Sequence, residues 1–288
     1  MRKFQLIILS IFSYFISYSQ SMHIGLFGGI SNYQGDLVDK PFVGRFIKPA
    51  FGLTAAYELS DRIQVRGGFT FASITGDDKY NTKTYLQERN LNFTSNISEL
   101  SLVGDLSLFN LYERKWTPYV FGGVALFHFN PYTTDAGGNR VYLKPLSTEG
   151  QGLSQYPDSK PYALTQLSLP FGGGFRYAFN DDIRLGVEMG IRKTFTDYLD
   201  DLSTNYVDQN DLITARGQQA VDLAYRGDEV PGGNPAYPAK GAQRGGALQK
   251  DYYYFTGLTL TFRFGGGNGS NLPRGSKHQN FGCPKAPY

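Results

Sequence analysis

The feature that most constrains the fold is an alternation of apolar and polar residues that recurs along most of the chain. It is clearest over residues 183–192, where apolar side chains alternate with Arg184, Glu188, Arg192 and two glycines. A period of two places successive side chains on opposite faces of a β-strand. Seven further segments follow the rule with varying strictness: 23–33, 50–59, 62–74, 95–109, 116–130, 164–179 and 252–264. The sequence therefore predicts an all-β fold of eight long strands.

The connections between these segments alternate between short and long. Short polar turns lie at 60–61, 110–115 and 180–182, and long links occupy 34–49, 75–94, 131–163 and 199–250. Short turns on one side and long loops on the other are typical of outer-membrane β-barrels. We therefore predict an eight-stranded antiparallel transmembrane β-barrel over residues 20–264, with four long extracellular loops and three short periplasmic turns.

Periodicity alone does not decide whether the apolar face points to lipid or into a core. The opposite face carries glycines and charges of both signs: Glu58, Arg66, Glu99, Asp105, Arg176, Arg184, Glu188, Arg192 and Arg263. Because side chains must fill the narrow interior of an eight-stranded barrel, we expect these nine to form a charge network there. The apolar face would then contact outer-membrane lipid. A soluble exported sandwich or lipocalin-like barrel is the alternative.

Aromatic residues gather near the predicted strand ends. They are Tyr57, Trp116, Tyr119, Phe127, Phe129, Tyr177, Phe179, Tyr198 and residues 252–254. Tyrosine and tryptophan are enriched where a membrane meets water, so we interpret this set as interfacial girdles. The girdles favour the membrane barrel over the soluble alternative.

Residues 1–19 have the pattern of a cleaved export signal. Arg2 and Lys3 precede an apolar run, and small residues stand directly before Gln20. Such a run is too short to span a bilayer and fits a signal peptide. The alternative is a buried strand at the N-terminus. We expect the mature protein to reach the outer membrane.

A Gly-rich segment, residues 265–288, follows the last predicted strand, and we expect it in the periplasm. Its final residues combine a basic and an aromatic side chain, and the candidate partner contact consists of Cys283, Pro284, Lys285 and Tyr288. A flexible segment can become ordered on contact with a partner. The alternative is a disordered chain end without a role.

Composition and motifs give little support for an enzyme or a nucleic-acid-binding protein. The net charge is only +3, without a run of basic residues. His23, His128 and His278 lack the spacing of metal ligands, and the sequence has neither a nucleophile elbow nor a phosphate loop. Acidic residues within 197–211 could attract a divalent cation, but we favour a solvated loop. We expect no catalytic residue, cofactor, metal or small-molecule substrate.

Several short motifs keep a specific order along the chain: 28–36, 117–123, 129–131, 146–152, 169–174, 194–201, 203–208 and 283–285. In these motifs and their order, the chain resembles the PorG-like outer-membrane proteins of the type IX secretion system of Bacteroidetes. The resemblance implies a non-enzymatic barrel that serves protein transport by docking on a periplasmic lipoprotein ring of the PorK–PorN type. Two other functions stay open: a free-standing adhesin or small receptor that binds through its long loops, and an outer-membrane enzyme.

Overall fold

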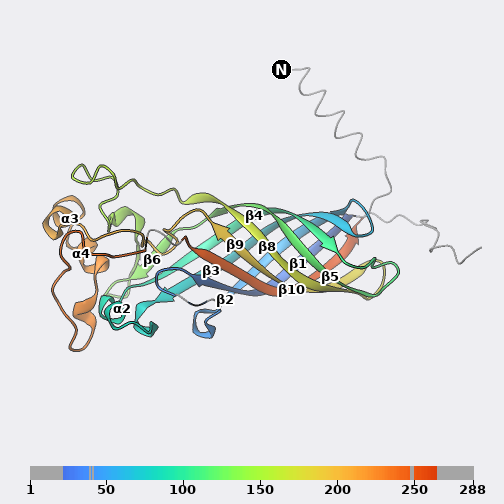
Figure 1. Cartoon of the computed structure of the whole chain (residues 1–288), viewed down its shortest axis with the longest axis horizontal. Coiled ribbons are helices and arrows are strands. Elements are labelled where there is room, and N and C mark those ends of the chain that lie inside the picture. The colour runs from blue at the N-terminus through green and yellow to red at the C-terminus, as the bar shows by residue number, and fades with distance from the viewer. Residues whose placement is uncertain (1–21, 39, 41, 247–249, 265–288) are drawn as a thin grey trace, which may run out of the picture.

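The computed structural model of the protein describes residues 22–38, 40, 42–246 and 250–264. Its wall consists of β1 (Met22–Gln34), β2 (Lys48–Glu58), β3 (Ile63–Asp77), β4 (Asn92–Ser107), β5 (Trp116–His128), β8 (Thr165–Ala178), β9 (Ile183–Thr194) and β10 (Tyr252–Phe264). Each of these eight strands pairs antiparallel with the next one in this order, and β1 pairs with β10 over its whole length to close the barrel (Figure 1). The predicted eight-stranded antiparallel barrel is confirmed.

The strand boundaries differ from the prediction mainly where the sheet extends beyond the apolar alternation. Strands β3 and β4 continue to the pair Asp77 and Asn92, past the predicted boundaries at residues 74 and 95. The backbone ladder continues at this end, where the outward-facing positions are polar: Thr75, Asp77, Asn92 and Thr94. The wall therefore extends beyond its apolar band on the side of the long links.

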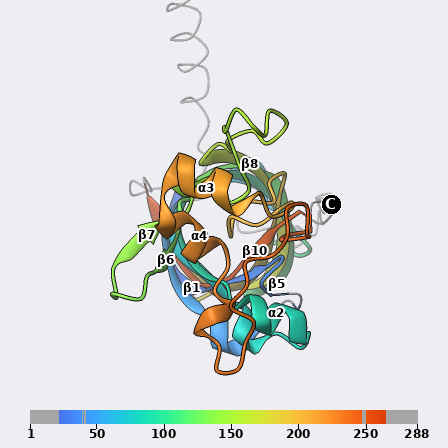
Figure 2. The same cartoon turned by 90° about the vertical axis from the view of Figure 1, so that its left-hand side faces the viewer.

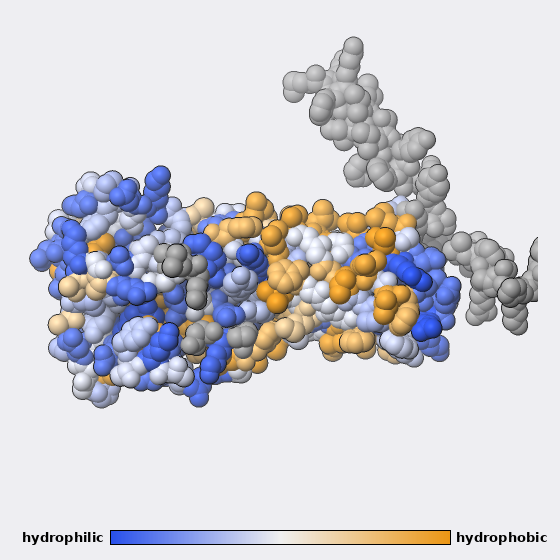
Figure 3. Space-filling view, viewed as in Figure 1, coloured by the Kyte–Doolittle hydropathy of each residue, from blue (hydrophilic) through white to orange (hydrophobic). Residues whose placement is uncertain are grey.

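The outer face of the barrel is apolar. Leu100 and Leu102 are 59% and 56% exposed, and apolar side chains cover the middle of the wall while hydrophilic residues cover both ends (Figure 3). Only a closed sheet or a helix satisfies all its backbone hydrogen bonds in hydrocarbon. An apolar belt on a closed sheet is therefore the surface that contacts lipid. Of the helices in the described ranges, none is long and apolar enough to span a bilayer.

The predicted aromatic girdles are only partly correct. Trp116, Tyr177 and Phe179 lie exposed on the outer face near the short turns. The assignment was wrong for five residues that are buried: Tyr119, Phe127, Phe129, Tyr253 and Tyr254. Tyr119, Phe127 and Tyr253 occupy inward-facing positions of their strands. Phe129 lies directly beyond the end of β5. A position near a strand end did not reveal which face the ring occupies.

The two ends of the barrel differ in structure. Short turns close one end, and four links between the strands gather at the other (Figures 1 and 2). These links contain η1 (Gly44–Phe46), η2 (Asp78–Tyr80), α2 (Thr84–Arg89), β6 (Pro131–Thr134), β7 (Arg140–Tyr142), η3 (Lys144–Leu146), α3 (Gln209–Arg216), α4 (Gln218–Ala224) and η4 (Gly227–Glu229). We call the described residues of the links at 35–47, 78–91, 129–164 and 195–251 the loop cap.

Candidate functional site

The middle of the barrel interior holds a network of charged side chains from four strands. The Arg66 guanidinium donates to Oε2 of Glu188 at 2.9 Å and to Oδ1 of Asp105 at 3.3 Å. Arg176 donates to the other oxygen of Asp105 at 2.9 Å, and the Tyr119 hydroxyl donates to Glu188 at 2.7 Å. Because each carboxylate accepts from more than one donor, these buried charges are compensated within the lumen.

A second group lies toward the short turns. Arg184 donates to Oε1 of Glu58 at 2.5 Å, and the Tyr112 hydroxyl donates to Oε2 of the same carboxylate at 2.7 Å. Arg263 donates to the Tyr112 hydroxyl at 3.0 Å. Tyr112 belongs to the turn between β4 and β5, so this group connects that turn with β2, β9 and β10.

The third group lies toward the loop cap. The Arg192 guanidinium makes two hydrogen bonds to Glu99, at 3.2 and 3.3 Å, and the Tyr253 hydroxyl donates to the same carboxylate at 2.7 Å. The structure therefore places all nine residues of the predicted interior network inside the barrel, in three groups along its axis. The tyrosine partners were not part of the sequence prediction.

Bulky rings fill the space between these groups. Phe121 lies against the backbone of Gly172 and Gly190, and a Cβ atom at either glycine would come within 2.8 and 2.7 Å of the ring. The glycines therefore make the room that the ring occupies. Three lumenal cavities have volumes of only about 10, 10 and 20 Å³. Each has room for about one water molecule, so the described side chains close the lumen.

The loop cap has an apolar core that continues into the barrel. Buried residues of all four links, including Leu37, Leu91, Leu143 and Leu212, belong to the same cluster as lumenal Phe127. Four rings connect the two regions in a series: Phe127, Phe129, Tyr162 and Tyr198, with successive centroids 5.6, 6.2 and 4.6 Å apart. We call this series the aromatic ladder. The long links thus fold onto the barrel mouth, which the sequence did not predict.

Buried ion pairs fix the links to one another. Arg244 is 2% exposed and donates to Glu149 at 3.0 Å and to the carbonyl of Asp201 at 2.6 Å. Glu149 also accepts the backbone N–H groups of Ser203 and Thr204, both at 3.0 Å. These contacts join two links that are far apart in the sequence.

Asp197, Asp200 and Asp201, which we expected in a solvated loop, are buried instead. Asp200 accepts a hydrogen bond from Tyr33 at 2.6 Å, and Asp251 lies 3.1 Å from the same hydroxyl. Burial raises the pKa of both carboxyls well above the ordinary value. Burial also raises the pKa of Asp197 to about 7 and that of Asp201 to about 6. The solvated-loop interpretation was wrong for Asp197, Asp200 and Asp201.

The other acidic residues of this segment have structural roles. Asp208 accepts the backbone N–H groups of Asn210 and Asp211 and thereby caps α3, and Asp211 accepts from the Tyr156 hydroxyl at 2.8 Å. Among the described residues, no three His, Cys, Asp or Glu side chains are placed to hold a metal ion together.

The remaining predicted residues do not join these groups. His23 lies in the lumen 3.4 Å from Glu58, whereas His128 lies on the outer face and contacts Thr165 at 2.9 Å. The predicted partner contact, residues 283–285 with Tyr288, lies outside the described residues, as do His278 and the predicted signal at 1–19.

A closed antiparallel barrel of eight strands with an apolar outer face and a filled polar lumen defines an integral outer-membrane β-barrel protein. The chain belongs to the family described as "Domain of unknown function (DUF6089)", whose model matches residues 2–217. No curated protein matches the sequence.

Solved structures of outer-membrane proteins resemble the fold at very low sequence identity. Neisserial surface protein A is 8% identical, with 84% of this chain and 97% of that chain covered and a TM-score of 0.41. Ail of Yersinia pestis, in complex with the heparin analogue sucrose octasulfate, is 9% identical, with 86% and 100% covered and a TM-score of 0.40. Outer membrane protein W of E. coli is 13% identical, with 86% and 100% covered and a TM-score of 0.37. The assignment to the outer membrane rests on this chain's own closed sheet and apolar exterior.

Proposed function

We propose that the protein is a non-enzymatic, non-conducting outer-membrane anchor that works by binding a partner. The observation that carries this proposal is the closed lumen, in which Arg66 and Arg176 bridge the middle of the barrel to Asp105 and Glu188. A barrel filled in this way provides a rigid membrane attachment rather than a path for solutes. In planar bilayers, the purified protein should show no stable ion conductance, and open-channel steps would contradict the proposal.

We infer from the order of the sequence motifs that the partner is a periplasmic lipoprotein ring of the PorK–PorN type. On this proposal, the protein serves type IX secretion as a docking point. The three short turns offer little surface, so we assign the contact to them together with the tail at 265–288, ending in Cys283, Pro284, Lys285 and Tyr288. This assignment rests on the sequence alone.

Affinity purification of the full chain and of a variant that stops at Gly266 tests this partner. The variant keeps β10 with Phe262 and Phe264, so it should still insert and show the heat-dependent gel mobility of a folded barrel. The full chain should capture the ring lipoprotein and the shortened chain should lose it. Equal capture would exclude the tail as the contact, and absence of the lipoprotein from both would contradict the secretion role.

The loop cap favours a second candidate, a surface barrel that acts as an adhesin or small receptor. Links of this length expose binding surfaces, and here they are held in one arrangement by Arg244, Glu149 and the aromatic ladder. A preorganised surface loses less entropy on binding than a mobile loop does. In the purification above, this candidate predicts that no periplasmic partner is captured and that ligands bind at the loop cap.

A further inference from the structure

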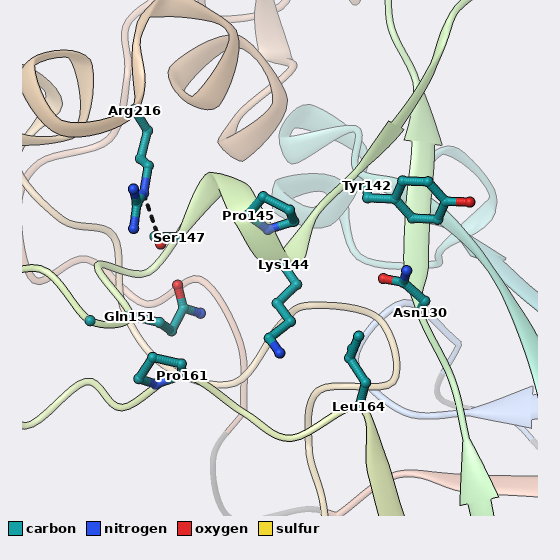
Figure 4. Close-up of a pocket in the computed structure, with 10 residues that line it drawn as sticks. Asn130, Tyr142, Lys144, Pro145, Ser147, Gln151, Pro161, Leu164 and Arg216 are labelled. Atoms are coloured by element: carbon teal, nitrogen blue, oxygen red, sulfur yellow. Dashed lines mark hydrogen bonds between the residues drawn. The ribbon is translucent and has the colours of Figure 1, made fainter.

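The loop cap contains a cavity of about 530 Å³ at the barrel rim (Figure 4). Its walls come from η3, the turn at 147–152, the C-terminal end of α3 and the rim residues Asn130 and Leu164. The rim is an extension of the sheet, because Phe129 donates its N–H to the carbonyl of Leu164 at 2.9 Å. The cavity therefore adjoins the end of the sheet, and its size is that of a small-molecule site.

The cavity is positively charged and has no acidic side chain in its lining. Lys144 and Arg216 both contribute to it, and neither takes part in any ion pair between described residues. Arg216 donates Nε to the Ser147 hydroxyl at 3.2 Å, which orients the guanidinium. The buried arginines of the lumen and of the cap core all have carboxylate partners, so these two cations differ from them.

A buried amide in the same cavity also lacks an acceptor. Gln151 is 3% exposed, and its Oε1 accepts the N–H of Glu149 at 3.1 Å, but its Nε2 has no hydrogen-bond partner. Figure 4 shows this amide nitrogen on the side of the cavity that faces Lys144. The Tyr198 hydroxyl is its polar neighbour within the cap. A ligand oxygen in the cavity would supply an acceptor for this buried nitrogen.

Apolar groups complete the lining of the cavity, with Tyr142 and Leu164 across from Gln151 and Pro161 beside it (Figure 4). Tyr142, Pro145, Pro161 and Leu164 present flat or aliphatic surfaces beside the polar group. Leu167 is exposed on the apolar belt only three residues beyond Leu164, a rise of about 10 Å along a strand. The cavity therefore lies just beyond the hydrocarbon level, where the headgroups of the membrane begin.

We propose that this cavity binds a phosphorylated saccharide. Its phosphate lies between Lys144, Arg216, the Ser147 hydroxyl and Nε2 of Gln151. Its sugar ring lies against Tyr142 and Leu164. Guanidinium and ammonium groups form strong charge-assisted hydrogen bonds with phosphate oxygens. The same chemistry occurs in a free sugar phosphate and in the headgroup of a phosphorylated glycolipid. This site is separate from the proposed periplasmic contact and does not depend on it.

Calorimetric titration of the full-length protein in detergent with glucosamine 1-phosphate tests the proposal, with glucosamine and inorganic phosphate as comparison ligands. We expect saturable binding of the sugar phosphate at one site, weaker binding of inorganic phosphate and no binding of glucosamine, which lacks the phosphate. Arg216→Gln and Lys144→Gln should each weaken binding by about tenfold or more, because each removes a charge-assisted contact. Lys240→Gln, which changes an exposed cap lysine outside the cavity, should bind as the unchanged protein does.

A second arm identifies the source of the ligand. Protein in nanodiscs that contain a phosphorylated glycolipid should lose affinity for added sugar phosphate if the lipid headgroup occupies the site, and should keep it if the natural ligand is free. Either result supports the phosphosaccharide site. The proposal is overturned if glucosamine binds as well as its phosphate does, if nothing binds, or if both cavity variants bind as Lys240→Gln does while keeping the gel mobility of the folded barrel.

Discussion

The barrel wall and the loop cap bury their side chains in opposite ways. The wall turns Leu102 outward and Arg66 inward, whereas the cap buries Leu202 and Leu212 and leaves most of its charged residues at its surface. The wall can expose apolar side chains because the sheet ladder satisfies the backbone hydrogen-bonding groups and because its outer face contacts lipid. The cap is surrounded by water and is held by an apolar core, as a soluble domain is.

Both regions nevertheless contain buried ion pairs that share a feature. In each, an arginine is held by carboxylates from a distant part of the chain: Arg66 by Asp105 and Glu188, and Arg244 by Glu149. These pairs specify which segments meet. We therefore expect the wall and the cap to lose stability separately, each when its own ion pairs are broken.

The largest expected effect is in the wall. Glu188→Leu removes one of the two carboxylates of Arg66 and the acceptor of Tyr119, and breaking such a buried pair costs about 3–5 kcal/mol. Unfolding in urea, followed by the loss of folded gel mobility, should therefore begin at clearly lower concentration. Met189→Leu, on the neighbouring lipid-facing position, should cost less than about 1.5 kcal/mol. Equal effects of the two changes would reverse the assignment of the faces.

A change in the cap should have a more local effect. Arg244→Met leaves Glu149 buried without its cationic partner. The free energy of opening the cap should therefore fall, and the cap should open more often. Limited proteolysis should then cut within 195–251 many times faster, while the urea midpoint of the barrel stays close to that of the unchanged protein. Loss of the folded barrel in this variant would show that cap and wall form one cooperative unit.

The smallest effect concerns the pH dependence of the cap. Burial, with a contribution from Asp36, raises the pKa of Asp197 from an ordinary 3.8 to about 7. The folded cap therefore holds this proton more tightly than the open cap does, so its stability is greatest at acidic pH and falls as pH rises through about 7. Deprotonation of Asp201, with a pKa of about 6, acts in the same direction.

Hydrogen exchange of the cap amides measures this dependence. After correction for intrinsic rates, opening should be at least about fivefold more frequent at pH 8 than at pH 5, since each pKa unit corresponds to about a factor of ten before screening. Asp197→Asn should reduce the pH dependence of cap opening. The exchange of wall amides should show no such dependence. A cap that is more protected at pH 8 would contradict the assigned direction.

The wall and the cap also differ in how far their structures could be predicted from the sequence. In the wall, a period of two is imposed by the backbone, so eight strands and all nine interior charges could be recognised from single segments. Tyr119 and Tyr253 were misassigned because a tyrosine suits both a membrane interface and a hydrogen-bonded lumen. Only its register within the strand separates the two positions.

The cap could not be predicted in this way because its core comes from several links without a common period. Leu91, Tyr162 and Leu212 join one cluster only after the barrel has brought the ends of their links together. The same holds for the cavity, in which Lys144 and Arg216 come from different links. One local signal was present: Asp208 before the pair Leu212 and Ile213 is a helix start, and α3 begins there.

The most direct test of the central claim, an apolar outer face in lipid around a polar lumen, uses the single tryptophan. Trp116 is 47% exposed on the outer face near the short turns, where its ring lies edge-on to Phe109. In vesicles, lipids brominated near the headgroup should quench its fluorescence strongly, lipids brominated deep in the chain should quench it less, and aqueous iodide should have little effect. Strong quenching by iodide without any effect of brominated lipid would contradict the account.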